Sequence, residues 1–392
     1  MRKLGAQPPP PPLQAGIRSG ARRLKAARYR RMITVSGPVV MFVVRQSPIC
    51  TEGETSTTPL RTLTADLRAA VLIPRRGPHA MQSEEAARGL ELWAELDGVD
   101  LLRVDDPSPH SVTEIYHGWL RDGGSHVVLG SYGSGLVRRA LPAVGRTGKV
   151  LWNHGGSADD LVRPGVVQVV APASTYLVEA VRQCARLGLG RLKIVCGKGP
   201  FAALVAKGAR DEARRLGISP ELVIGGDRLA GVDPAVGILI TAGFREDVSL
   251  VARIRTGESQ PPLLGCVAAG VPQFGARLGP YADGVIGPTQ WTPSPGTPGV
   301  GPSGTGFERL YEEAFGTKPG YVAAQAAAAG FLAAHAHRSG MDRDDVLAWR
   351  TSTLLGDFAL EDDWRQVGYS VSTIRWRDGR MELIPSHPGP SG

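Results

Sequence analysis

The segment from His126 to Leu161 restricts the possible folds of this chain more than any other stretch. Two short apolar runs, 126–130 and 149–153, are each followed directly by a loop of glycine and serine, with a predicted helix at 136–146 between them. Short apolar runs that end at glycine are typical of buried strands in a parallel sheet. Both loops therefore leave the carboxyl ends of strands, where open α/β sheets bind ligands.

These two loops carry groups that can bind a ligand, but no combination of nucleophile and base that could catalyse a reaction. They offer backbone N–H groups and the hydroxyls of Ser131, Ser134 and Ser157, which suit a polar or anionic group. The run from Tyr132 to Gly135 departs from the GxSxG motif of a nucleophilic serine. We interpret His154 as a partner of the loop backbone and not as a base for Ser134. The sequence predicts a binding protein and not an enzyme.

The same alternation of strand and helix continues through most of the chain. It runs from about residue 67 to 161 and again from 166 to 289. Two α/β units of similar design predict a cleft between them. A loop rich in proline and glycine, 292–304, precedes an alanine-rich helix predicted at 322–339, and a turn at 377–380 predicts a closing hairpin.

The positive charge of the protein is concentrated at its N-terminal end. The net charge is +8, and residues 1–31 hold nine lysines and arginines without an acidic residue. Subtracting those nine leaves the rest of the chain at −1, so no basic face for nucleic acid is expected on the folded part. The proline tract and basic residues of 1–31 cannot bury a core and predict disorder.

An export signal is one interpretation of the residues that follow. The apolar run 33–44 is too short for a permanent transmembrane helix, but it fits the core of a secretory signal. Residues 29–33, YRRMI, are similar to a twin-arginine motif, and Cys50 would then be a site of lipid attachment. The preceding Pro48-Ile49 lacks the small residues of a lipoprotein cleavage site. A mis-assigned start or an N-terminal strand remains the alternative.

Neither a metal site nor a dinucleotide site is predicted. The cysteines form no CxxC, and we expect Cys184 and Cys196 to be buried and inert. His335 and His337 are two positions apart and so lie on different faces of a helix. Residues 197–202, GKGPFA, match GxGxxA after a strand. Because the proline removes an N–H donor, we interpret this motif as a tight turn and predict no cofactor.

Several segments together resemble the type I periplasmic binding fold. The similarity covers roughly 69–385 and points in particular to the leucine/isoleucine/valine-binding family of ABC-transporter substrate-binding proteins, including its amide-sensing regulators. It is carried by AAVLIPRRGPHAMQSEEAARGLELW, LRVDDPSPHSV, LGSYGSGLVRRALPAV, WNHGGSADDL, YVAAQAAAAGFLAA and WRDGRMELIP.

The resemblance implies two Rossmann-like lobes of parallel sheet flanked by helices, joined by a hinge of three crossovers. Lobe I would comprise 67–171 plus 288–350, lobe II 172–287 plus 351–385, and 1–66 a leader and linker. The implied function is capture of an amino acid, amide or carboxylate by hinge closure for an ABC permease. Such a protein is extracytoplasmic, with a lipid anchor as its link to the membrane. The alternative is a cytoplasmic ligand sensor that acts on a regulatory protein.

The resemblance also implies which residues contact the ligand. By position they are Ser134, Gly155, Ser157, Gln82, Tyr176, Phe201 and Phe244.

Two departures from the family pattern bear on the ligand. Residues 266–275, CVAAGVPQFG, lack the acidic residue that usually holds a ligand ammonium, and neither Glu246 nor Asp283 stands at the matching place. Arg75 and Arg76 replace small polar residues in the first loop, and either is suited to a ligand carboxylate. The class of small polar ligand therefore stays open.

Overall fold

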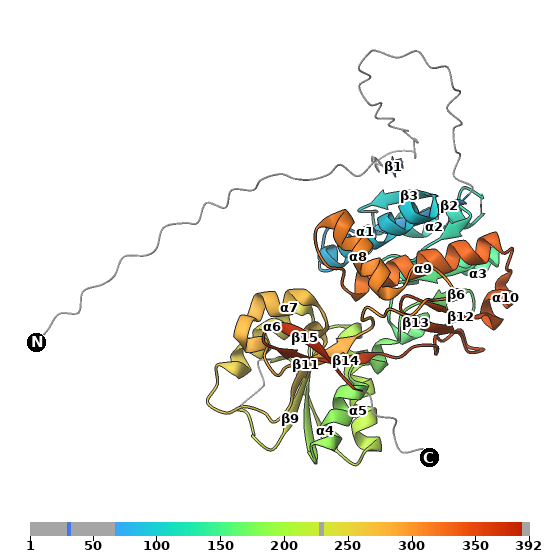
Figure 1. Ribbon diagram of the computed structural model, residues 1–392. Helices are drawn as coiled ribbons and strands as arrows, with labels where there is room; N and C mark the ends of the chain where they lie inside the picture. Colours follow the sequence, from blue (N-terminus) through green and yellow to red (C-terminus); the bar gives the residue numbers. More distant parts are fainter. Residues whose placement is uncertain (1–29, 33–66, 122, 227–230, 386–392) are drawn as a thin grey trace, which may run out of the picture.

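The computed structural model describes residues 67–121, 123–226 and 231–385, together with the backbone of Arg30–Met32. Cys50 and most of the predicted export segment lie outside the described residues. The chain folds into two α/β lobes, one above the other in Figure 1. The α/β fold expected from the sequence is confirmed. Among the described helices, none is long and apolar enough to cross a membrane.

The first lobe is a parallel sheet with helices on both faces. Its strand order is β1-β3-β2-β4, and a bridge between Leu129 and Trp152 continues it to β5 and β6. The strands are β1 (Arg30–Met32), β2 (Leu67–Ile73), β3 (Val99–Asp105), β4 (Val127–Val128), β5 (Leu151–Asn153) and β6 (Val166–Gln168). The helices are α1 (Ala80–Asp97), α2 (Val112–Arg121), α3 (Ser134–Thr147), α8 (Gly304–Phe315), α9 (Tyr321–Arg338) and α10 (Arg343–Ala348).

Strand β2 shows why helices are needed on both faces of this sheet. Its residues alternate between two hydrophobic clusters: Val71 packs with α1 and α9, whereas Ala70 and Leu72 pack with α2 and α3. Successive side chains of a strand point to opposite faces. Apart from the exposed Arg68, every residue of β2 is apolar and buried, so both faces of the sheet must be covered.

The second lobe repeats the design. Its sheet has the order β15-β14-β11-β10-β9-β7-β8, in which β14 and β15 are antiparallel additions. The strands are β7 (Arg191–Cys196), β8 (Ser219–Ile224), β9 (Gly237–Thr241), β10 (Leu264–Cys266), β11 (Ile286–Thr289), β14 (Ser372–Arg377) and β15 (Arg380–Ile384). The helices are α4 (Val178–Arg186), α5 (Pro200–Arg215), α6 (Phe244–Arg255) and α7 (Pro272–Leu278).

The two lobes share one topology. Across the sheet of lobe I the strands lie in the order β3-β2-β4-β5-β6, and across that of lobe II in the order β8-β7-β9-β10-β11. In both lobes the first of these strands along the chain, β2 or β7, therefore lies between the second and the third. In such sheets the chain reverses direction between the first and third strands, and ligands bind outside the carboxyl ends there. This point falls between β2 and β4 in lobe I and between β7 and β9 in lobe II.

Helix α9 is the predicted alanine-rich core helix, shifted by one residue, and nearly all of it is buried. It lies beside α1, although the two are far apart in the sequence (Figure 1). A Cβ added at Gly89 would lie 2.2 Å from the Ala323 carbonyl oxygen, and one at Gly330 would lie 2.2 Å from the Trp93 ring. Small residues on both helices therefore permit this close approach.

Two predicted strands end earlier than expected because tertiary contacts bend the chain. The apolar run 262–269 is a strand only over β10, and Val267–Gly270 form a 3-10 turn. Gly270 packs against the Pro288 carbonyl, where an added Cβ would lie at 1.7 Å. The run 166–172 is likewise a strand only over β6, because the chain then leaves lobe I for lobe II.

The division of the chain into lobes remains a prediction, which the packing refines at one place. Leu354, Phe358 and Trp364 belong to the hydrophobic cluster of α1 and α9. Leu354 lies in the turn between β12 (Arg350–Thr353) and β13 (Gly356–Ala359), and Phe358 lies in β13. We propose that lobe I extends beyond residue 350 and ends after Trp364.

Candidate inter-lobe ligand site

Hydrogen bonds join the three segments that connect the lobes. The Tyr369 hydroxyl in the third segment donates to the Val169 carbonyl in the first, at 2.5 Å. Gln290 in the second segment accepts the N–H of Ala171 in the first, at 2.8 Å. The crossovers therefore form one connected hinge at the back of the cleft.

Aromatic side chains from both lobes meet next to this hinge. Gln290 Nε2 donates to the Tyr176 hydroxyl at 2.6 Å, and the Tyr176 ring lies edge-on to Phe201, 5.8 Å between centroids. Tyr321, at the start of α9, packs against lobe I and also against the α6 side of lobe II. Tyr132, at the end of β4, interacts with Tyr321.

These tyrosines are neutral hydrogen-bonding groups. Burial raises the pKa of Tyr176 to about 12, against the effect of its hydrogen bonds to Ser157 and Gln290. Burial also raises the pKa of Tyr132 and Tyr321. Apolar rings with neutral hydroxyls suit a ligand that has an apolar body and polar ends.

The two glycine/serine loops lie against each other, as their positions after neighbouring strands predict. Ser134, the first residue of α3, accepts the N–H of Ala158 through its hydroxyl at 3.0 Å. The Gly133 N–H donates to the Gly155 carbonyl at 3.0 Å. A Cβ at Gly155 would lie 2.6 Å from the Tyr132 Cα, so a larger residue does not fit this contact.

A buried amide pair, which the sequence analysis missed, shapes the second loop. Asn153 Nδ2 donates to the Gly156 carbonyl and to Gln168 Oε1, both at 2.6 Å, and its Oδ1 accepts the Gly156 N–H at 2.8 Å. Gln168 in turn donates to the Leu161 carbonyl. The sequence contains one sign of this pair, because Asn153 and Gln168 are polar residues at the ends of two otherwise apolar strands.

The seven residues implied by the resemblance divide into two groups. Ser134, Gly155, Ser157, Tyr176 and Phe201 belong to one connected set of loop and ring contacts.

The remaining two residues begin helices. Gln82 lies half-buried in the first turn of α1, and its buried Oε1 has no hydrogen-bond partner among the described residues. Phe244 is the first residue of α6 and packs against the core of lobe II. All seven assignments as ligand contacts stay predictions.

The two arginines of the first loop have carboxylate partners within the chain. Arg75 bonds Asp105 at 2.9 Å and Glu84 at 2.5 Å. Arg76 bonds Asp106 at 3.0 Å, with its side chain 84% exposed. Arg75 is therefore committed to the protein itself, whereas Arg76 stands at the edge of a pocket of about 630 Å³ on lobe I.

In lobe II a buried carboxylate, Asp247, organises the loops that face the cleft. It accepts the N–H of Ala242 at 3.0 Å and that of Ala268 at 2.8 Å. Burial raises its pKa to about 7. Asp283 is remote from this edge, because it precedes β11 and accepts the N–H of Asp378.

His154 does not serve as a base for Ser134. It is completely buried, neither ring nitrogen has a hydrogen-bond partner that meets normal geometry among the described residues, and burial lowers its pKa to about 4. The ring does interact with the backbone of Gly130, next to the first loop, but outside normal hydrogen-bond geometry, so the expected hydrogen bond to the loop backbone stays a prediction.

The GKGPFA segment is the tight turn that the sequence predicted. Gly199 has a φ of 107°, and a Cβ at Gly197 would lie 2.6 Å from the Ala242 Cβ. Close packing against the loop after β9 therefore fills the place where a pyrophosphate would approach. Cys184 and Cys196 are buried thiols, as expected. His335 and His337 stack on different partners, Trp349 and His126.

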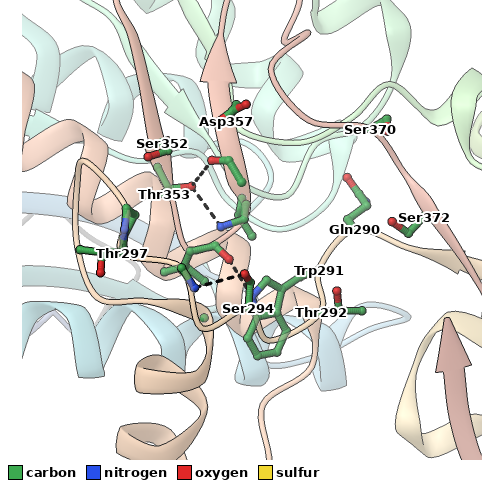
Figure 2. Close-up of a pocket in the computed structure, with 16 residues that line it drawn as sticks. Gln290, Trp291, Thr292, Ser294, Thr297, Ser352, Thr353, Asp357, Ser370 and Ser372 are labelled. Carbon is green, nitrogen blue, oxygen red and sulfur yellow. Dashed lines mark hydrogen bonds between the residues drawn. The ribbon is translucent and has the colours of Figure 1, made fainter. Parts of the chain in front are cut away.

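A second pocket, of about 330 Å³, lies at the hinge (Figure 2). Gln290, Ser370 and Ser372 lie on one side of it, and Thr297 and Ser352 lie on the opposite side. Hydroxyl and amide groups line it from two connecting segments, through Gln290 and Ser370, and from β12, through Ser352 and Thr353.

Comparison with known proteins gives the following matches. A family model described as periplasmic binding protein matches residues 66–353. No curated protein matches the chain. Among solved structures, the leucine binding protein of Thermotoga maritima has a TM-score of 0.68 at 14% identity, covering 81% of this chain and 98% of that chain.

Two further solved structures are similar over the same extent. An ABC transporter substrate-binding protein from Sphaerobacter thermophilus has a TM-score of 0.69 at 16% identity and covers 82% of this chain and 97% of that one. The solute binding protein of an ABC transporter from R. palustris, in complex with benzoate, has a TM-score of 0.65 at 17% identity and covers 81% and 95%. These identities support a shared fold and leave the ligand open.

Proposed function

Because this chain belongs to the periplasmic binding protein family, we propose that it captures a small polar solute between its lobes and delivers it to an ABC permease. The observation that carries the proposal is the set of groups at the hinge. Gln290 in the second crossover binds Tyr176 at the entry to lobe II, and Tyr176 contacts Phe201 of the same lobe. Ligand contacts beside a hinge couple binding to the relative position of the lobes.

The chemistry of the cleft favours a polar or anionic head on an apolar body. Backbone N–H groups and hydroxyls of the two loops suit the head, and the rings of Tyr132, Tyr176 and Phe201 suit the body. No acidic residue occurs in 266–275, and the carboxylate nearest to that segment, Asp247, is already occupied by two backbone N–H groups. We propose an amide or carboxylate ahead of a standard α-amino acid.

In this function the protein acts outside the cytoplasm and is not an enzyme. This assignment rests on the family, whose members bind solutes for transport. The alternative, a cytoplasmic sensor, depends on the N-terminal residues. Sequencing the mature N-terminus distinguishes them: cleavage before Cys50 supports the importer, and an intact leader supports the sensor.

A thermal-shift screen of the full chain tests the binding function. The probes are amino acids, aliphatic amides, small carboxylates and NAD(H). A ligand at a hundred times its Kd adds about 2.7 kcal/mol to the free energy of unfolding, which raises the Tm. The Ser157→Ala variant should bind the active class about tenfold more weakly, since it loses one hydrogen bond to a charged or polar group.

The matched control for this variant is Ser219→Ala. Ser219 is exposed at the amino end of β8, so its loss should leave the shift unchanged. A shift with NAD(H) alone would contradict the proposal.

A further inference from the structure

The pocket of about 630 Å³ occupies the topological switch point of lobe I. It lies among the loops that follow β2, β3 and β4, and Pro74, Pro109 and Leu136 form part of its wall. The corresponding point of lobe II is closed, because Gly197 packs directly against Ala242. The pocket of lobe I therefore has no counterpart at the contact between Gly197 and Ala242.

Tyr132 connects this pocket to the hinge cluster. It lines the pocket, and it interacts with Tyr321 on the side of the cleft. Its ring is also edge-on to His79, with the centroids 5.9 Å apart. Tyr132 therefore lies between the pocket and the hinge cluster and contacts both.

The charged residues that line the pocket are all basic. They are Arg76, Arg138 and Arg139, and no aspartate or glutamate lines it. His79 adds no charge near neutral pH, because burial lowers its pKa.

Of these three arginines, Arg139 alone has no carboxylate partner among the described residues. Arg76 is paired with Asp106. Arg138 is paired with Asp160 through two hydrogen bonds, at 2.6 and 2.8 Å.

Arg139 instead donates one N–H to the Pro109 carbonyl at 3.0 Å. No carboxylate of the described residues forms an ion pair with it. Its remaining N–H groups keep the fork geometry that matches a carboxylate.

Gly135, at the glycine/serine loop, and Arg139 both line the pocket and lie four residues apart on α3, on the same face of the helix. Four residues correspond to about 6 Å along a helix axis. We propose that the pocket binds a terminal carboxylate through Arg139, so the solute is an elongated molecule with a carboxylate at its far end. This inference rests on the proposed function, because the other end of the solute lies at the glycine/serine loops.

Calorimetric titration of the full chain tests the inference. The probes are the mono-amides of adipate, pimelate, suberate and terephthalate, each compared with its own diamide. A mono-amide presents one carboxylate to Arg139 and an amide to the loops, so we expect at least one mono-amide to bind about tenfold or more tightly than its diamide. Arg139→Gln should abolish this preference and leave diamide binding unchanged.

Arg146→Gln is the matched control, because Arg146 is exposed in the last turn of the same helix. It should retain the preference. The inference is overturned if diamides bind as tightly as mono-amides, or if Arg139→Gln keeps the preference.

Two further outcomes separate this inference from the proposed function. If none of the probes binds while an amino acid or amide does, the carboxylate-terminated class is wrong and the binding function stands. If no small solute of any class binds, both proposals fail.

Discussion

His154 and Asp247 show how burial can outweigh hydrogen bonding in setting the pKa of a residue in this protein. Burial lowers the pKa of His154 to about 4 and raises that of Asp247 to about 7. Asp247 is nevertheless held by two backbone N–H groups, whereas His154 has no hydrogen-bond partner of normal geometry among the described residues. His154 is therefore the clearer source of acid sensitivity.

We predict that His154 destabilises the protein as the pH falls from about 6.5 to about 4. In that range the unfolded chain binds a proton at this histidine and the folded chain does not, so the free energy of unfolding decreases. The loss amounts to about 3 kcal/mol at most. Urea unfolding of the wild type and of His154→Gln at several pH values measures it. Parallel pH curves for the two proteins would contradict the prediction.

At the scale of elements, the contact between α1 and α9 holds lobe I together. The helices approach closely because glycine and alanine line the contact. The sequence predicted a close-packed core helix from its alanines, but it did not identify α1 as the partner. Periodicity reports the buried face of a helix and not the element that covers it.

We predict that Gly89→Ala lowers the free energy of unfolding by about 1–3 kcal/mol. The new Cβ would lie 2.2 Å from the Ala323 carbonyl oxygen, so the helices must separate. Gly145→Ala is the control, since Gly145 lies within α3 with nothing near its Cβ position. It should stabilise the protein by up to about 1 kcal/mol. Urea unfolding compares the two, and equal effects would disprove the packing argument.

At the scale of the whole molecule, Gln290 connects the parts that must move. Its side chain binds Ala171 in the first crossover and Tyr176 at the entry to lobe II. A hinge needs segments that rotate without separating, and these hydrogen bonds keep the crossovers together. Ligand capture and lobe position are coupled through the same residue.

We predict that Gln290→Ala lowers the free energy of unfolding by about 1–3 kcal/mol, because the Ala171 N–H loses its acceptor. It should also broaden the distribution of distances between the lobes. Spin labels at the exposed positions Glu95 and Lys207, in a Cys50→Ser background, measure these distances. The native Cys184, Cys196 and Cys266 are buried.

Ser370→Ala serves as the control for the hinge, because Ser370 is exposed in the third crossover. It should change neither stability nor the distance distribution. If Gln290→Ala behaves like this control, the side chain does not hold the crossovers together.

The sequence by itself determined the order of strands and helices, the two-lobe α/β fold and the position of the glycine/serine loops. These features depend on periodicity and turn residues, which act over a few neighbouring positions. Only the tertiary structure decided which groups form the site. Asn153 meets Gln168, Tyr176 meets Gln290, and Arg139 pairs with no carboxylate of the described residues, because these outcomes depend on residues brought together from distant segments.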